Sequence, residues 1–197
     1  MWQADIGHGL VERMYEHKDG ISFRKIERRD LEDLQKLKRE SWWGTNRTLC
    51  VNLDDQNEWY ESIPSDQLFL IGQLPTEKYE NYFYSVGVVA YTDIDYISRT
   101  LKVSGSVYKE WRKPEIVKPA FAAGLDFAFE MLNMHRVEGE VLEYHKGAQK
   151  LEMDYLGFTV EGRKRKAVYK CGTYYDALVI GMLREEWERS PRVKAYG

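Results

Sequence analysis

The sequence has few cysteines, no long apolar run and little net charge. Its 197 residues contain two cysteines, Cys50 and Cys171, without CxxC spacing, so neither a disulfide framework nor a zinc site is expected. No apolar stretch approaches the roughly 20 residues that span a bilayer. The first twenty residues lack the charged start and apolar run of a signal peptide. These absences predict a cytoplasmic protein with no membrane partner and no metal.

The small net charge bears on nucleic-acid binding. The formal net charge is −3 at pH 7, so no global field attracts nucleic acid or an anionic membrane. The basic run Arg163–Lys166 lies on an expected strand, where alternation places half of its side chains on each face. A solvated hairpin explains this run, and nucleic acid is not an expected partner.

Apolar and aromatic residues are plentiful. With 43% hydrophobic residues the chain can form one globular domain with a substantial core. The aromatic content of 14%, with 14 Tyr and 6 Trp, fits either a ring-lined groove or ordinary packing. No repeat or linker divides the chain, so we expect an N-terminal extension (1–20), a domain (21–187) and a C-terminal tail (188–197).

One stretch, Ser104–Val137, organises the prediction, because it reads as a strand, a basic turn, a long helix and a further strand. Its helical face repeats every 3.6 residues. The apolar residues on that face are Phe121, Leu125, Ala128, Phe129 and Leu132. A turn before a helix presents unpaired N–H groups to an anion. The stretch therefore fits either a diphosphate site or an ordinary crossover with a solvated basic turn.

The remaining elements follow from alternation, caps and turns. Expected strands are Ile21–Ile26, Gln67–Leu74, Tyr82–Tyr96, Leu101–Tyr108, Arg136–Glu143, Thr159–Tyr169 and Tyr174–Leu183. Further helices are expected at Leu10–Tyr15, from Leu31 with Asp30 as N-cap, after Asp55 with Glu58 completing a capping box, and at Gly147–Tyr155. The order predicts an α+β fold with a mostly antiparallel sheet.

Several local motifs resemble those of the GCN5-related N-acetyltransferases (GNAT family), particularly the RimJ/RimL-like branch. They are Gly87–Asp95 with Arg99-Thr100, Phe127–Val137, Leu156–Phe158, Val160–Arg163, and Tyr174–Asp176 before Leu183–Trp187. Together they cover about residues 21 to 187. The resemblance implies a GNAT-like mixed sheet with splayed middle strands and helices on both faces.

The resemblance also implies acetyl-CoA as donor and an amine as acceptor, a protein N-terminus or a small molecule. In such enzymes the strand corresponding to Gly105–Lys109 diverges from that of Arg136–Glu143, and the pantetheine arm pairs with exposed backbone groups in the wedge. This assigns backbone contacts with the cofactor to Val107, Tyr108 and Lys109.

The turn that should cradle the diphosphate departs from the family pattern Arg/Gln-x-x-Gly-x-Gly/Ala. Arg112 matches its first position, but Glu115 and Val117 replace the small residues, which normally let backbone N–H groups approach phosphate. Pro119 would cost no hydrogen bond in a first helical turn. Three outcomes remain open: CoA held by Arg112, Lys113 and Lys118, a shifted cofactor pose, or no cofactor.

The expected helix Gly147–Tyr155 and the residues before it also depart from the family pattern. The family pattern Asn-x-x-Ala-x-x-x-Tyr supplies a cofactor contact and the acid that protonates the departing thiolate. Here the spacing is shifted by one residue: Ala148 matches loosely, and His145 or Lys146 stands near the Asn position. Tyr155 is a candidate acid, although a helix residue just before Leu-Gly-Phe is more often a core residue.

Attack on a thioester needs a neutral amine, so a base must accept a proton. Glu138 and Glu140 alternate on one face of the strand beside the wedge and are the candidate bases; a solvated sheet face is the alternative reading. Trp42, Trp43 and Arg47 follow the first helix, where the family shapes its acceptor groove, and core packing is again the alternative.

The sequence thus predicts an acetyl-CoA-dependent N-acetyltransferase, with a catalytically inactive binding module of the same fold as the alternative. The aromatic run Tyr82–Tyr84, with Tyr79 before it, fits a sheet edge or the surface of a homodimer.

Overall fold

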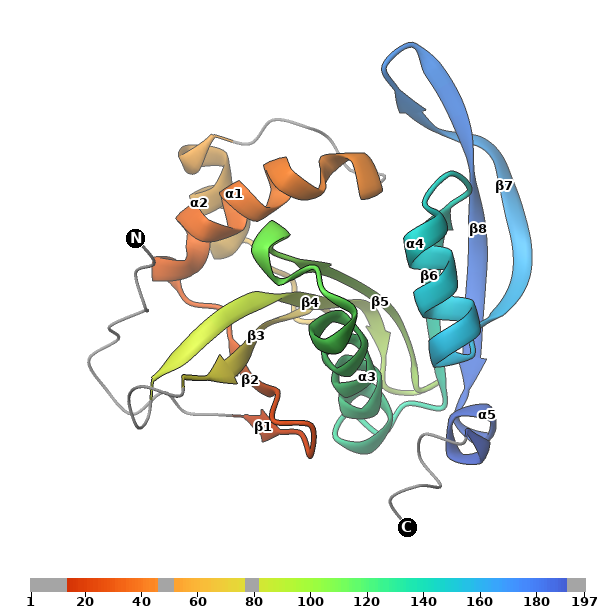
Figure 1. Cartoon of the computed structure of the whole chain (residues 1–197), viewed down its shortest axis with the longest axis horizontal. Coiled ribbons are helices and arrows are strands. Elements are labelled where there is room, and N and C mark those ends of the chain that lie inside the picture. The colour runs from red at the N-terminus through yellow and green to blue at the C-terminus, as the bar shows by residue number, and fades with distance from the viewer. Residues whose placement is uncertain (1–13, 46–51, 77–81, 191–197) are drawn as a thin grey trace.

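The computed structural model describes residues 14–45, 52–76 and 82–190. These residues form one eight-stranded sheet in the order β1-β2-β3-β4-β5-β6-β8-β7 (Figure 1). The strands are β1 (Tyr15–Glu16), β2 (Ser22–Lys25), β3 (Leu68–Pro75), β4 (Phe83–Asp95), β5 (Thr100–Val107), β6 (Arg136–Leu142), β7 (Thr159–Lys170) and β8 (Thr173–Leu183). Neighbouring strands are antiparallel except β5 and β6, which are parallel. The predicted mixed, mostly antiparallel α+β sheet is confirmed.

Helices connect the strands on both sides of the sheet (Figure 1). They are α1 (Leu31–Ser41), α2 (Leu53–Glu61), α3 (Pro114–Glu130), α4 (Lys146–Gln149) and α5 (Arg184–Arg189). Three-residue 3₁₀ turns lie at Arg28–Asp30, Trp42–Gly44 and Lys109–Trp111, and a π-helical turn, Lys150–Leu156, continues α4. Within the described residues, no helix combines the length and the apolar character needed to cross a membrane.

Burial on both faces explains the apolar run in β3. Phe69 and Ile71 belong to a core that also contains residues of α1, whereas Leu70 belongs to the larger core around α3. Successive strand residues point to opposite faces, so a strand buried on both faces is apolar at consecutive positions. This is why the β3 segment could be recognised from sequence.

The helix α3 crosses one face of the sheet and carries the predicted apolar face. Leu125, Ala128 and Phe129 are fully buried, and Phe121 and Leu132 pack against the same core.

The start of this helix decides the position of Pro119. Pro119 would have cost no hydrogen bond in a first turn, but the helix begins at Pro114, which occupies the favourable first position, and Pro119 lies in the interior. Pro119 therefore leaves the carbonyl of Glu115 without its intrahelical N–H donor.

Three local predictions need correction. Tyr15 forms a strand with Phe23 instead of ending a helix, and residues 10–13 of that expected helix lie outside the described residues. The cap of α2 is Asn52, with Asp55 closing the capping box from inside the helix. Asp30 does not cap α1; both of its carboxylate oxygens accept hydrogen bonds from Arg24 at 2.6 Å.

The end of the chain also differs from expectation, in part. Glu188, assigned to the loosely held tail, belongs to α5, and residues 191–197 lie outside the described residues. In α5, Trp187 is buried and its indole N–H donates to Asp126 of α3 at 2.7 Å.

Candidate active site: the gap between two central strands

The middle of the sheet contains a gap. The parallel strands β5 and β6 pair at Thr100–Lys102 and Arg136–Glu138 and then diverge. Beyond that point β5 keeps its partner β4 as far as Val107, and β6 keeps its partner β8 as far as Leu142. The splayed middle strands predicted from the sequence are confirmed.

Backbone groups face this gap from both sides. The amide of Tyr108 donates to the carbonyl of Val86, so alternation turns the peptide groups of Gly105 away from β4 and toward the gap. On the other side, the amide of Glu143 donates to Asp176 of β8, so the peptide groups of Glu140 face the gap. Two internal strand edges thus face each other across the gap.

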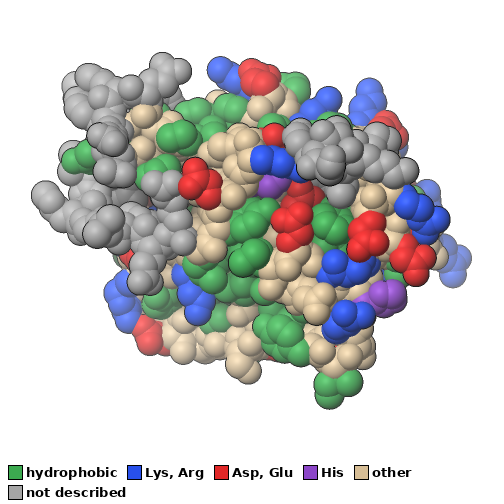
Figure 2. All heavy atoms as spheres, turned by 90° about the horizontal axis from the view of Figure 1, so that it is seen from below, with side chains coloured by type: hydrophobic (Ala, Val, Ile, Leu, Met, Phe, Trp, Pro, Cys, Tyr) green, Lys and Arg blue, Asp and Glu red, His purple; other side chains and the backbone are tan. Residues whose placement is uncertain are grey.

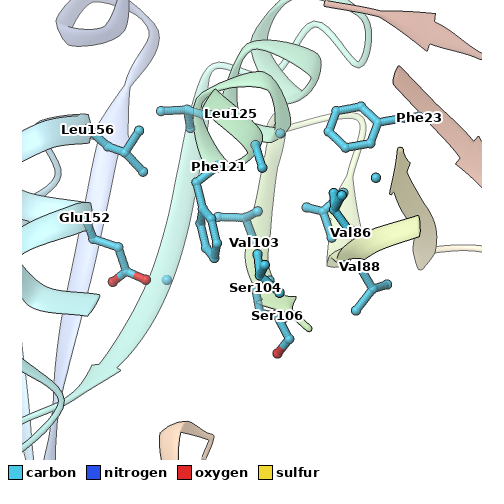
Figure 3. Close-up of a pocket in the computed structure, with 18 of the residues that line it drawn as sticks. Phe23, Val86, Val88, Val103, Ser104, Ser106, Phe121, Leu125, Glu152 and Leu156 are labelled. Atoms are coloured by element: carbon cyan, nitrogen blue, oxygen red, sulfur yellow. The ribbon is translucent and has the colours of Figure 1, made fainter. Parts of the chain in front are cut away.

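A cleft opens along these strands. Its floor is formed by the β5 residues Val103–Val107 together with Gly139 of β6, and Phe121 of α3 lies against Gly105. Glu152 and Leu156 of the π-helical turn line the side near α4 (Figure 3). The lining is therefore almost entirely apolar, with one carboxyl group.

The three predicted backbone contacts lie at the end of β5. Val107 lines the cleft, and its carbonyl accepts from Arg112 at 2.9 Å. The amides of Tyr108 and Lys109 are already used, by the carbonyl of Val86 and by a Glu40 carboxylate oxygen at 3.1 Å. Burial, reinforced by nearby Asp33, raises the pKa of the Tyr108 hydroxyl. As a ligand contact, the end of β5 therefore offers Val107 more readily than Tyr108 or Lys109.

The predicted diphosphate turn is the start of a helix. Arg112 is turned toward α1, where its guanidinium donates to the hydroxyl of Ser41 at 3.1 Å. Lys113 is the N-cap of α3, and Glu115 lies in its first turn, exposed, where a negative side chain stabilises the helix dipole. Lys118 is exposed and lies 4.9 Å from the centre of the Tyr155 ring. Lys113 and Lys118 are thus the more accessible cations, and Arg112 fastens the turn to α1.

The one-residue shift ahead of Leu156-Gly157-Phe158 coincides with the π-helical turn Lys150–Leu156. Because each π-type hydrogen bond spans one more residue than an α-helical bond, such a turn absorbs one extra residue.

The structure places the three predicted contacts at the start of α4. His145 caps α4, its Nδ1 accepting from the amide of Ala148 at 3.0 Å, and its ring packs against Gly44. Ala148 is half-buried against the main core. Lys146 is exposed and donates to Gln149 at 3.3 Å. His145 thus has a structural role, and contacts of all three with a cofactor stay predictions.

The predicted catalytic carboxylates are engaged in ion pairs. Glu138 accepts from Arg136 at 2.9 Å, and Glu140 accepts from Lys164 of β7. Both side chains project from the face of β6 opposite to Gly139, which lines the cleft. Tyr155, the predicted acid, is 37% exposed and is absent from the cleft lining. Their catalytic roles stay predictions.

The predicted acceptor residues Trp42 and Trp43 join α1 to the opposite side of the gap. The ring of Trp43 packs against that of Tyr144 with the two planes tilted by 41°, its carbonyl accepts from the Tyr144 hydroxyl at 2.5 Å, and the residue is 43% exposed. The carbonyl of Trp42 accepts from Lys170 of β7 at 2.6 Å. The two tryptophans thus form part of a bridge over the wide end of the gap. Arg47 lies outside the described residues.

Sequence reasoning missed Glu152. Its side chain enters the cleft, and its Oε2 is shielded from water without a hydrogen-bond partner in the described part of the chain. Burial raises the pKa of this carboxyl to about 8. In the family pattern Asn-x-x-Ala-x-x-x-Tyr, the tyrosine lies four residues after the alanine. Four residues after Ala148 comes Glu152, so its place in this pattern was the signal that could have identified it.

Charge and metal ligands give no competing site in the described residues. On the face that Figure 2 shows, Lys and Arg side chains are interspersed with Asp and Glu. No three His, Cys, Asp or Glu side chains of the described residues gather in a way that suits a metal ion. The one described cysteine, Cys171, is an exposed thiol in the turn between β7 and β8.

Comparison with known proteins gives partial sequence matches. No family model matches the chain. It is 31% identical over 103 residues to the SPbeta prophage-derived uncharacterized N-acetyltransferase YokL of Bacillus subtilis, a match covering 52% of this chain and 58% of that protein. It is 24% identical over 102 residues to the putative ribosomal N-acetyltransferase YdaF of the same organism, covering 52% and 55%. The chain thus spans little more than half the length of these curated relatives.

Solved structures match almost the whole chain. Spermidine N-acetyltransferase from Vibrio cholerae, in complex with CoA and spermine, has a TM-score of 0.78 at 20% identity, covering 86% of this chain and 99% of that one. A dodecameric structure of the same Vibrio cholerae enzyme gives a TM-score of 0.71 at 19% identity, covering 89% and 99%. These similarities confirm the predicted GNAT fold.

Proposed function

We propose that this protein transfers the acetyl group of acetyl-CoA to a primary amine. The observation that carries the proposal is the gap between β5 and β6, where two strands in the interior of the sheet diverge and the peptide groups of Gly105 face the space between them. An interior gap of this kind costs hydrogen bonds, and an extended amide-containing chain is the ligand that restores them. The pantetheine arm of CoA carries two amides.

The residues around the gap suit acetyl-CoA. The peptide groups of Gly105 face the gap and can pair with a pantetheine amide. Lys113 and Lys118, at the start of α3, supply positive charge for the phosphates. When bound, acetyl-CoA supplies an activated acetyl thioester. The protein's part is to hold it extended and to exclude water with Phe121, Leu125 and Leu156.

The names of the relatives and structural neighbours suggest which amine accepts the acetyl group. The relative named as a putative ribosomal N-acetyltransferase supports a protein N-terminus, and the structural neighbours named for spermidine support a small polyamine. The exposed Trp43 offers an aromatic surface to a cationic amine. We infer a primary amine as acceptor, on a RimJ/RimL-like enzyme working in the cytoplasm.

Two measurements test this function. Acetyl-CoA at about 100 times its Kd should raise the free energy of unfolding by about 2.7 kcal/mol, which a melting experiment detects. Release of free CoA should depend on an added amine, either spermidine or a peptide with a free N-terminus. Absence of a melting shift at millimolar acetyl-CoA would refute the proposal.

Substitutions at the start of α3 test the proposed phosphate contacts. Replacing both Lys113 and Lys118 by alanine should weaken acetyl-CoA binding at least about tenfold, because two charge-assisted hydrogen bonds are lost. Lys36→Ala, on the exposed side of α1, is the matched control and should leave binding unchanged. If the double variant and the control bind acetyl-CoA equally well, the diphosphate does not bind at Lys113 and Lys118.

A binding module without turnover is the second candidate, and the start of α3 favours it. Arg112 is engaged with α1, and the exposed carboxylate of Glu115 opposes an anion at the same helix end. This candidate predicts a melting shift with acetyl-CoA and no amine-dependent release of CoA.

A further inference from the structure

Glu152 is held firmly at the edge of the cleft. Its carbonyl accepts hydrogen bonds from the amides of Gly157 and Phe158, the latter at 2.9 Å, which closes the π-helical turn. Gly157 adopts a left-handed conformation with φ of 92°, which glycine tolerates best. The backbone thus fixes the direction of the side chain, and Figure 3 shows the carboxyl extending toward the space beside Phe121.

The surroundings of the carboxyl group keep it neutral. Residues of α3 and of the strands β2, β3, β4, β5, β6 and β8 line the cleft, and no ionisable side chain other than Glu152 is among the lining residues. Burial alone raises the pKa of Glu152 to about 8, so the acid form predominates at neutral pH.

Charged groups on the neighbouring elements point elsewhere. Lys118 of α3 lies over the ring of Tyr155. On β6, Glu138 and Glu140 are in ion pairs with Arg136 and Lys164 on the face opposite to Gly139. No cation is therefore in place to hold Glu152 as a carboxylate within the described residues.

We propose that the Glu152 carboxyl is the proton donor to the sulfur that leaves during acetyl transfer, an inference that rests on the proposed function. The geometry supports it, because Glu152 is the one cleft-lining ionisable group in the described residues and its Oε2 has no protein partner there. The hydroxyl of Tyr144 is turned to the carbonyl of Trp43, and Tyr155 contacts Lys118 outside the cleft.

The step balances with no further reactant. The lone pair of the neutral amine nitrogen forms a C–N bond to the thioester carbonyl carbon. The C–S bond breaks, and its electron pair moves to sulfur. The proton of the Glu152 carboxyl passes to that sulfur and yields the free thiol of CoA. The nitrogen loses one proton to water, and the Glu152 carboxylate regains one from water, so the products are an N-acetyl amine and CoA.

The ratio of kcat for the wild-type protein to kcat for Glu152→Gln, measured against pH, tests the role. Titration of the amine affects both proteins equally and cancels in the ratio. A donor must be protonated, so the ratio should be at least about tenfold near pH 6.5 and should fall toward one as pH rises through about 8. A ratio that rises with pH would make Glu152 a base, and a constant ratio would make its role structural; either overturns the proposal.

A second readout does not depend on turnover. A carboxyl that stays protonated in the folded protein but ionises in the unfolded chain stabilises the fold at low pH, and this contribution is lost as pH rises through the folded pKa. The melting temperature of Glu152→Gln should therefore rise relative to wild type between pH 5 and pH 9. Glu185→Gln, on the exposed side of α5, is the control and should show no such trend.

The two proposals can fail separately. If no amine is acetylated, both fail. If acetylation proceeds and the melting comparison shows no trend with pH, the carboxyl is ionised in the fold and only the assignment of Glu152 falls. Acetyl-CoA should give equal melting shifts with wild type and Glu152→Gln, because the substitution keeps the shape of the side chain.

Discussion

At the scale of single residues, the ion pair between Arg24 and Asp30 is buried. The two side chains are 2% and 8% exposed, and the guanidinium donates to both carboxylate oxygens at 2.6 Å. Asp30 also accepts from the amide of Glu27 at 2.7 Å. The pair connects strand β2 to the turn before α1, so it fixes how the chain leaves the sheet.

Removing one partner of this pair should be costly. Asp30→Ala leaves the Arg24 charge buried and unpaired, which should lower the free energy of unfolding by about 3–5 kcal/mol. Urea denaturation at pH 7 measures the change. Glu32→Ala, at an exposed site in the first turn of α1, is the control and should cost less than about 1 kcal/mol. Equal effects of the two substitutions would contradict the role assigned to the pair.

Asp30 and Glu152 show why single-residue roles were hard to predict. Asp30 has the residue type and position of an N-cap, and only the fold reveals that Arg24 competes for the same carboxylate. Glu152 reads as an ordinary polar residue in a helix, because an α-helical period does not anticipate the π-helical turn that directs it into the cleft. Both depend on partners distant in sequence or on a rare helix geometry.

At the scale of elements, β5 is positioned by a close approach of β4. A Cβ added at Gly87 would lie 2.9 Å from the Cα of Val107 and would collide with the carbonyl of Ser106. Gly87 faces the part of β5 that borders the gap. Glycine at this position therefore lets β4 hold β5 away from β6.

The substitution Gly87→Ala tests this arrangement. Since backbone atoms oppose the added methyl group, the free energy of unfolding should fall by about 3 kcal/mol in urea denaturation. The matched control is Gly162→Ala in β7, where the nearest atom, Cβ of Val179, lies at an ordinary 3.9 Å. A Gly87→Ala protein as stable as the control would show that β5 can move aside.

Elements were predictable where the pattern follows from burial. The strand β3 and the helix α3 were recognised because their buried faces are continuous and apolar. The start of α3 could not be fixed from sequence, because Pro114 and Pro119 both suit a first turn and only the tertiary fold decides between them. The open edge between β5 and β6 came from the family resemblance, since no residue type marks an unpaired backbone.

At the scale of the whole molecule, buried polar contacts join three distant segments. The ring of His17 lies 2.9 Å from a carboxylate oxygen of Asp126 in α3, and the other oxygen accepts from Trp187 of α5. This junction ties both described ends of the chain to α3. The gap between β5 and β6 is instead bridged at its wide end by Trp43 and Tyr144. The junction thus fixes both described ends of the chain against α3, whereas β5 and β6 stay apart at the gap.

The central claim is that acetyl-CoA lies in the gap and pairs with its backbone, and residue-resolved amide hydrogen exchange tests it most directly. With saturating acetyl-CoA, the amide of Gly105 should exchange at least about tenfold more slowly, because the ligand supplies a hydrogen-bond partner to a group that faces the gap. The amide of Val89, in a strand paired on both sides, should slow only as far as global stability increases. Unchanged exchange at Gly105, in a sample whose melting temperature acetyl-CoA has raised, would contradict the account.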